Sequence, residues 1–218
     1  MISENKSLEK LIKIQENLAK KIILKNDLKE IKLIAGFDLA FSKNKIFCCG
    51  VILNRELELI EKKFSEEVEN FPYIPGFLAF REGPIIIKTY KKLKSKPDII
   101  FIDGHGIAHP KFFGIASHIG LLLDKPTIGV AKNKLIGEYE EPKNVWEEEK
   151  LLFKNKHVGW VLKTKKDCKP IFISPGHKIS LEKSLELTKK CLKGFKLPEP
   201  LRLSHLEVNK FKDLSLKI

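Results

Sequence analysis

The sequence predicts an α/β fold with one mixed sheet, in which an antiparallel meander precedes parallel strands and helices flank the sheet. Two observations favour it. Apolar segments at 32–41, 45–53 and 57–64 are separated by short polar turns, which is typical of an antiparallel meander. Short β-branched segments at 99–102 and 126–130 enclose a helical pattern, which is typical of a right-handed crossover between parallel strands.

The N-terminal segment, residues 5–25, carries apolar residues at helical spacing with Lys and Glu between them, which predicts an amphipathic helix packed by one face. Residues 197–218 show only weak periodicity and are predicted to form a C-terminal tail. The chain has 218 residues, of which 43% are apolar, and no linker or repeat. A single domain over residues 1–218 is therefore expected.

An acidic residue interrupts the first predicted strand. Asp38 lies among apolar neighbours, on the same strand face as Ile34 and Gly36. A lone buried carboxylate costs several kcal/mol unless it is paired or bound to a metal. The alternative is an exposed strand face, which the apolar neighbours on both faces disfavour. Asp38 is therefore a candidate functional residue.

Within residues 70–84, Pro72 and Pro75 stiffen an extended loop around Tyr73. In a basic protein, an aromatic ring on such a loop can stack on a base or wedge against it. The alternative is a hydrophobic plug beneath the loop. Pro84 suits the first turn of a helix, which predicts a helix over 85–94 with Glu82 at its entrance.

A second acid follows the buried strand at 99–102. Asp103 ends this strand, and the loop 104–109 after it contains two glycines and two histidines before a helical pattern at 112–123. Ligands of open α/β sheets bind at this edge. The alternative is that Asp-Gly here forms only a turn. Lys132 closely follows the strand at 126–130 and is predicted at the same edge, where a lysine can hold a phosphate or be an ordinary surface residue.

The last third of the chain carries weaker signals. Residues 137–150 are acidic and are predicted to form an exposed excursion, followed by strands at 158–164 and 170–173. The segment 174–177, Ser-Pro-Gly-His, is predicted as a tight loop before a helix capped by Ser180. A loop that precedes a helix N-terminus is a potential anion site.

The composition narrows the class of partner. The formal charge of +13 favours a polyanionic partner, nucleic acid first, although a lysine-rich composition with only three arginines can also reflect genomic or thermal bias. No segment has the length of a membrane span and the N-terminus lacks a signal-peptide pattern, so a cytoplasmic protein without a membrane partner is expected. The four cysteines form no Cys-x-x-Cys pair, which predicts reduced thiols.

Three carboxylates stand out in this scheme: Asp38 on the first strand, Glu82 near a helix start and Asp103 at the end of the fourth strand. Acids on the first and fourth strands of such a sheet match the ribonuclease H-like arrangement, in which these strands are neighbours. Clustered carboxylates repel one another unless divalent cations neutralise them, and oxygen ligands suit Mg²⁺ or Mn²⁺. Such a cluster can hold the attacking and leaving oxygens of a phosphodiester.

The chain resembles the endonuclease V family, the deoxyinosine 3′ endonucleases, over about Gly36 to His205. Lys111 and Phe41 depart from it, where the family often has Arg and Tyr. The resemblance rests on six segments in order: Gly36–Phe41, Pro72–Glu82, Asp103–Pro110, Gly114–Gly120, Pro126–Lys132 and Ile173–His177.

The resemblance implies an endonuclease dependent on Mg²⁺, with Mn²⁺ as a substitute, that acts in DNA repair as a monomer on DNA containing deoxyinosine. It implies hydrolysis of the second phosphodiester 3′ to the lesion, giving 3′-hydroxyl and 5′-phosphate ends. Asp38, Glu82 and Asp103 correspond to metal ligands, and His109 and Lys132 to further catalytic residues at the cut phosphate.

The resemblance also implies a set of substrate-binding residues, in which Tyr73 is the wedge and Gly106 with its neighbours forms the lesion pocket. An inosine-specific endoribonuclease acting on RNA, another ribonuclease H-like nuclease such as a resolvase, a catalytically dead binder and a purely structural domain remain as alternatives. The other substrate-binding residues are Pro75, Gly76, Arg81, Gly104, His105, His118, Ser174, His177 and His205.

Overall fold

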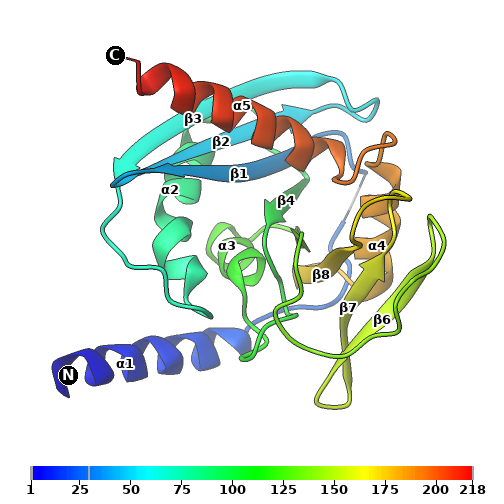
Figure 1. Cartoon of the computed structure of the whole chain (residues 1–218), viewed down its shortest axis with the longest axis horizontal. Coiled ribbons are helices and arrows are strands. Elements are labelled where there is room, and N and C mark those ends of the chain that lie inside the picture. Colours follow the sequence, from blue (N-terminus) through cyan, green and yellow to red (C-terminus); the bar gives the residue numbers. More distant parts are fainter. Residues whose placement is uncertain (1, 29, 218) are drawn as a thin grey trace.

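The computed structural model describes the backbone of residues 2–28 and 30–217 and contains one eight-stranded mixed sheet flanked by helices (Figure 1). The strand order is β3-β2-β1-β4-β5-β8-β7-β6. The strands are β1 Ile34–Ser42, β2 Lys45–Leu53, β3 Leu59–Val68, β4 Ile99–Asp103, β5 Thr127–Ala131, β6 Glu148–Phe153, β7 Lys156–Leu162 and β8 Ile171–His177. The helices are α1 Ile2–Ala19, α2 Leu78–Lys92, α3 Ile115–Leu123, α4 Leu181–Lys190 and α5 Glu199–Ser215.

The strand pairing confirms the predicted mixed sheet. Strands β1, β2 and β3 form an antiparallel meander, whereas β4 is parallel to both β1 and β5. The β1–β4 register ends with Phe37 opposite Ile102. The next residue on each strand is Asp38 and Asp103, respectively, so the register alone brings these two acids to the same edge of the sheet.

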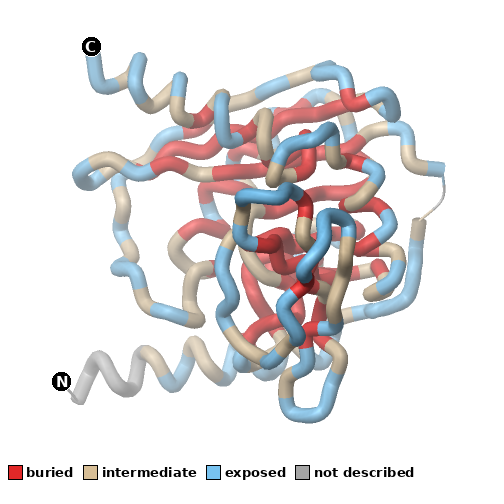
Figure 2. The backbone as a smooth tube through the Cα atoms, turned by 45° about the vertical axis from the view of Figure 1, so that its right-hand side comes forward, coloured by how far each residue is buried: buried red, intermediate tan, exposed pale blue. Residues whose placement is uncertain are grey.

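The sheet has an apolar cluster on each face, and the buried residues follow its strands through the molecule (Figure 2). Side chains of α4 and α5 belong to one cluster, and side chains of α2 and α3 belong to the other. Cys48 and Cys49 are adjacent on β2 and belong to opposite clusters, and both are free thiols, as predicted. None of the described helices is long and apolar enough to cross a membrane.

Helix α5 corrects the prediction that residues 197–218 form a tail. This helix lies across β1 and β2, on the face opposite α2 (Figure 1). Its residues Leu201, Ser204 and Val208 are buried, and Phe211 packs against the same cluster. These positions follow a helical spacing of three or four residues, but the polar Ser204 weakens the apolar pattern in the sequence.

Two other helices differ from their predicted bounds. Helix α1 ends at Ala19 rather than at residue 25. Helix α2 begins at Leu78 and contains Pro84 in its interior, so Glu82 lies inside the helix and not at its entrance. A proline inside a helix removes one backbone hydrogen bond, and the sequence rule that places proline in the first turn therefore gave the wrong start.

Two strand predictions were also wrong. Residues 174–177 continue β8 instead of forming a loop, with a register shift opposite Thr127 and Ile128 that leaves Gly176 between two paired residues. A Cβ at Gly176 would lie 2.2 Å from Thr127 Oγ1, so the close packing requires glycine here. The end of the acidic segment 137–150 begins the edge strand β6, which continues to Phe153 and pairs with β7.

Candidate active site

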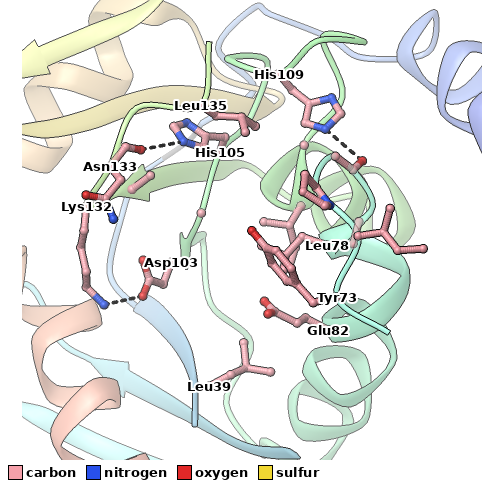
Figure 3. Close-up of a pocket in the computed structure, with 18 of the residues that line it drawn as sticks. Leu39, Tyr73, Leu78, Glu82, Asp103, His105, His109, Lys132, Asn133 and Leu135 are labelled. Carbon is pink, nitrogen blue, oxygen red and sulfur yellow. Dashed lines mark hydrogen bonds and ion pairs between the residues drawn. The ribbon is translucent and has the colours of Figure 1, made fainter. Parts of the chain in front are cut away.

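A pocket of about 410 Å³ opens at the sheet edge where β1, β4 and β5 end, beside the first turns of α2 (Figure 3). The two aspartates and Lys132 approach it from the strands, and Glu82 approaches it from α2. Ten of the residues predicted for the site line it: Asp38, Tyr73, Pro75, Gly76, Glu82, Asp103, Gly104, His105, His109 and Lys132.

Asp38 and Asp103 form the centre of this site. Both side chains line the same pocket, and the negative charge of Asp38 acts on the Asp103 carboxyl group. Lys132, which was predicted at the same sheet edge, donates its Nζ to Asp103 Oδ2 at 2.6 Å. Asp38 Oδ1 accepts a hydrogen bond from the Leu39 backbone N at 2.8 Å, and His205 Nδ1 lies 2.6 Å from Asp38 Oδ2.

The two aspartates have opposite pKa shifts. Burial and the charge of Asp38 raise the pKa of Asp103 to about 6, although Lys132 opposes this shift. Burial also acts to raise the pKa of Asp38, but the hydrogen bond to His205 and the charge of Lys132 outweigh it and hold that pKa below its ordinary value. Asp38 is therefore the more acidic member of the pair, and Asp103 is the member that retains a proton more readily.

Glu82 faces Asp103 from the other side of the pocket, which Asp38 also lines (Figure 3). Its side chain is on the buried face of α2, and the residue is 7% exposed. Burial raises the pKa of Glu82 to about 8; the charges of Asp103 and Asp38 act in the same direction and Arg81 opposes them. This carboxyl group is therefore largely protonated at neutral pH until a positive charge enters the pocket.

The donor set fits a divalent cation in its chemistry. Three carboxylates share one pocket with Lys132 and Lys134, and their hard oxygen atoms are the ligands that Mg²⁺ and Mn²⁺ prefer. Across the described part of the chain, no three acidic, imidazole or thiol side chains are close enough together to hold a metal ion. Glu82 thus lies in the pocket without forming a closed ligand set with the aspartates.

Two histidines, the partly buried His105 and the buried His109, fix the loops around the pocket. His105 Nε2 lies 3.1 Å from the Asn133 carbonyl oxygen, and His109 Nε2 lies 3.1 Å from the Gly76 carbonyl oxygen. Burial lowers the pKa of each imidazole to about 4, so both are neutral at pH 7. His109 therefore connects the Gly-His loop to the loop that carries Tyr73.

Tyr73 lies at the rim of the pocket and is 64% exposed, which contradicts the alternative of a hydrophobic plug. Arg81, predicted to bind substrate, is engaged within the protein. Its guanidinium pairs with Glu69 at 2.7 Å and lies over the ring of Phe41, 4.2 Å from the centroid, and 5.5 Å from the centroid of Tyr73. The structure thus places Arg81 behind the tyrosine and outside the pocket lining.

Three further predicted residues lie beneath or away from the pocket. Gly106 donates its backbone N–H to Ser174 Oγ at 2.8 Å and packs so closely on β8 that a Cβ would lie 2.1 Å from the Pro175 carbonyl oxygen. His118 is buried between the rings of Phe80 and Phe113. Neither Gly106 nor His118 lines the pocket, and Gly104 and His105 are the members of that loop that do.

His177 lies farther from the site than predicted. Its Nδ1 accepts a hydrogen bond from the Ile23 backbone N at 3.3 Å, and its Nε2 lies 3.6 Å from Asp124 Oδ1. The side chain connects β8 to the segment after α1 and to the end of α3. His205, predicted as a substrate-binding residue in the tail, instead contacts Asp38 from α5 and lies outside the pocket lining.

Gln15 was not predicted as a site residue, but it lines the pocket and its Nε2 donates to the Gly76 carbonyl oxygen at 2.8 Å. It is a buried residue of α1, a helix for which no chemistry was predicted. The available signal was its position on the apolar stripe of that helix, with Leu8, Leu11 and Leu18 at helical spacing. Asn133, Lys134 and Leu135, beyond Lys132, also line the pocket.

Comparisons with known proteins agree on one family. A family model described as Endonuclease V matches residues 16–206. A protein named Endonuclease V from Thermosipho melanesiensis is 50% identical over 198 residues, covering 90% of this chain and 88% of that protein. The crystal structure of the Bacillus subtilis Endonuclease_V has a TM-score of 0.91 at 34% identity, covering 96% of this chain and 93% of that chain.

One solved relative contains nucleic acid. The Ciona intestinalis Endonuclease V structure, in complex with a 24mer DNA containing an inosine followed by a ribo-adenosine, has a TM-score of 0.83 at 28% identity. That likeness covers 95% of this chain and 98% of the Ciona chain.

Proposed function

Since this chain belongs to the endonuclease V family of nucleases, we propose that it cuts DNA at a deaminated purine, deoxyinosine. The cut is at the second phosphodiester on the 3′ side of the lesion and leaves 3′-hydroxyl and 5′-phosphate ends, as a step in DNA repair. One observation carries the proposal: Asp38, Glu82 and Asp103 line one pocket, in which Lys132 binds Asp103 and the exposed Tyr73 borders the rim.

Asp38, Glu82 and Asp103 would hold the divalent cation, Mg²⁺ or alternatively Mn²⁺. When bound, the cation supplies positive charge that stabilises the negative charge developing on the phosphodiester. The raised pKa values of Glu82 and Asp103 support this assignment, because a cation in the pocket favours the ionised form of both groups.

Lys132 is the positive group that the protein itself supplies at the proposed cut site. Asp103 holds its ammonium group at 2.6 Å, so the lysine is positioned before substrate binds. An ammonium group fixed in this way can contact a phosphate without losing further side-chain entropy. The neutral His105 and His109 keep the flanking loops in place, where the backbone of Gly104 can read the edge of an extruded base.

Matched oligonucleotides test the substrate. We expect a DNA strand with one deoxyinosine to be cut at the second phosphodiester 3′ to it in Mg²⁺, while the same strand with adenosine remains intact. An RNA strand with one inosine serves as the comparison. Faster cutting of the RNA would favour an endoribonuclease, and cutting of branched DNA regardless of inosine would favour a resolvase.

Two variants test the metal ligands. Asp38→Ala and Asp103→Ala should abolish cleavage, because each removes negative charge that holds the cation, whereas binding to deoxyinosine DNA should persist in Ca²⁺. Full activity in either variant, or of the unaltered protein in excess chelator, would contradict the metal assignment. Loss of binding together with cleavage would indicate that these acids hold the fold and not a cation.

A further inference from the structure

A cleft lined by lysines lies between α1 and the loop that follows His109. Its walls include Asn17 and Phe112, and Glu16 is the one acidic side chain among its described lining residues. We name this surface the lysine groove and define it by Lys13, Lys20, Lys111 and Lys154. Nothing in the catalytic arrangement uses these four residues.

The groove carries a net positive charge. Lys111 Nζ forms an ion pair with Glu16 at 2.6 Å, which neutralises one of the four lysines. Lys13, Lys20 and Lys154 are exposed, and the structure shows no carboxylate partner for them among the described residues. Three ammonium groups therefore point to a ligand with several negative charges along its length.

Both walls of the groove continue from walls of the active-site pocket. On α1, Gln15 hydrogen bonds to the Gly76 carbonyl oxygen, and its neighbour Glu16 lines the groove. On the opposite wall, His109 contacts the same carbonyl oxygen, and Pro110 to Phe112 follow directly along the chain. The pocket and the groove thus adjoin at the Gln15–Gly76–His109 contacts, which places the groove next to the site.

Phe112, in the wall of the groove, is held by a second aromatic ring beside it. The rings of Phe112 and Phe153 pack with their centroids 5.6 Å apart. Lys154 Nζ lies 5.2 Å from the Phe153 ring centroid, and Lys156 Nζ lies 5.2 Å from that of Phe112. These contacts restrict the lysines of the β6–β7 turn, which lowers the entropy cost of placing their charges against a ligand.

We propose that the lysine groove binds the sugar–phosphate backbone of the DNA strand outside the segment held in the active site. This inference rests on the proposed function for its ligand, because a substrate strand is the polyanion that passes through the adjoining pocket. Its consequence is that part of the affinity depends on the length of the DNA flank on one side of the lesion and is independent of base sequence.

The test compares two charge-matched triple variants. The groove variant is Lys13→Ala with Lys20→Ala and Lys154→Ala. The control variant replaces the exposed Lys91, Lys94 and Lys96 with alanine. These lysines lie in the last turn of α2 and just after it, away from the pocket. Affinity for duplex DNA with and without deoxyinosine is measured by fluorescence anisotropy in Ca²⁺ over a range of salt concentrations, with a thermal melt of each variant.

We expect the slope of log affinity against log salt to fall by about 2 to 3 in the groove variant, because each lost phosphate contact lowers it by roughly 0.9. The control variant should keep the original slope, and both variants should keep the original melting temperature. An equal slope in all three proteins would overturn the proposal. So would binding of a polyglutamate peptide by the groove with an unchanged DNA slope.

Shortened substrates identify which DNA flank, 5′ or 3′ to deoxyinosine, the groove binds. The DNA flank is shortened stepwise on the 5′ or the 3′ side of deoxyinosine. In one of the two series, the affinity of the unaltered protein should fall until it equals the affinity of the groove variant. No such convergence in either series would overturn the proposal. Unmodified DNA is measured as well, so DNA binding by the lysine groove and cleavage at deoxyinosine are tested separately. A lower salt slope in the groove variant, without cleavage at deoxyinosine by the unaltered protein, would support the groove alone. Cleavage with an unchanged salt slope would support the proposed function alone.

Discussion

His205 Nδ1 lies 2.6 Å from Asp38 Oδ2, so a residue of α5 contacts a carboxylate of β1 that is 167 positions away in the sequence. Asp38 is 4% exposed, and this contact helps offset the cost of burying its charge. The position of α5 depends on Gly36, because a Cβ there would lie 2.1 Å from the Pro200 carbonyl oxygen. The absence of a side chain at Gly36 therefore lets His205 reach Asp38.

Gly36→Ala should displace α5 from the sheet. The added Cβ meets backbone atoms, which cannot rotate away, so we expect a loss of about 1–3 kcal/mol in the free energy of unfolding and a marked loss of cleavage. Urea denaturation and a cleavage assay measure the two effects. Gly83→Ala is the matched control. Gly83 lies inside helix α2, and a Cβ there would lie 3.7 Å from Ile119 Cδ1, which is an ordinary van der Waals contact. This variant should therefore raise the free energy of unfolding by about 0.5–1 kcal/mol. Equal stability of the two variants would contradict the close approach.

The Asp38–His205 pair predicts a pH window for stability. The hydrogen bond to Asp38 raises the pKa of His205, so the stabilisation is complete below the ordinary histidine value of 6.5 and is lost as the pH rises through the folded-state pKa. Burial acts to raise the pKa of Asp38, but the hydrogen bond from His205 helps to lower it below the ordinary value of 3.8. The ionised Asp38 therefore contributes its full stabilisation of the fold above pH 3.8, and this contribution is lost as the pH falls through the folded-state pKa of Asp38.

The loss of stability in His205→Gln should thus be greatest between pH 3.8 and 6.5 and should shrink at higher pH. The side chain of His205 is 46% exposed, so solvent screening limits the effect to at most about 1 kcal/mol. Urea denaturation in chelator at several pH values measures it. A loss that grows above pH 8 would contradict the charged pair.

Glu82 should make the metal-free protein less stable at alkaline pH. Burial raises its pKa to about 8, and a carboxyl group whose folded-state pKa exceeds its unfolded value of 4.5 lowers stability as the pH rises from 4.5 to 8. In chelator, Glu82→Gln should therefore melt at a higher temperature than the unaltered protein at pH 8.5, with little difference at pH 4. A divalent cation should remove this advantage. A variant that is less stable at pH 8.5 would contradict the raised pKa.

The sequence predicted the centre of the site because its signals are local. Asp38 and Asp103 each follow apolar strand residues, and a parallel register places them together, as the structure confirms. The sequence did not predict how α5 packs, because Gly36 and His205 meet only through tertiary contacts. Gln15 was not predicted for the same reason, because its side-chain amide donates a hydrogen bond to a carbonyl group 61 positions away in the sequence.

Arg81 should help to position the ring of Tyr73. Its planar guanidinium lies over Phe41 and near Tyr73 while it pairs with Glu69. Arg81→Lys keeps the positive charge but loses the planar stacking, so we expect a loss of about 2- to 5-fold in cleavage of duplex substrate, with a smaller loss on single strands. Arg81→Met, which keeps the length without the charge, should also lower the melting temperature. Equal losses on both substrates in Arg81→Lys would contradict a positioning role.

Tyr73 provides the sharpest test of lesion recognition. Removing a base from a duplex costs a few kcal/mol, and an aromatic ring that stacks on what remains offsets roughly 1–3 kcal/mol of that cost. Pro72 and Pro75 restrict the loop, so the ring loses little entropy when it engages DNA. Tyr73→Ala should therefore weaken cleavage of deoxyinosine in duplex DNA strongly and in single strands less, because the target base there is already unstacked.

Two measurements accompany this variant. Its melting temperature should not change, because the 64% exposed ring contributes little to the core. Tyr73→Phe is the matched control and should retain most of the duplex activity, since stacking needs the ring and not the hydroxyl group. Equal losses on duplex and single-stranded substrates, together with a lower melting temperature, would show that the ring supports the loop and does not separate bases.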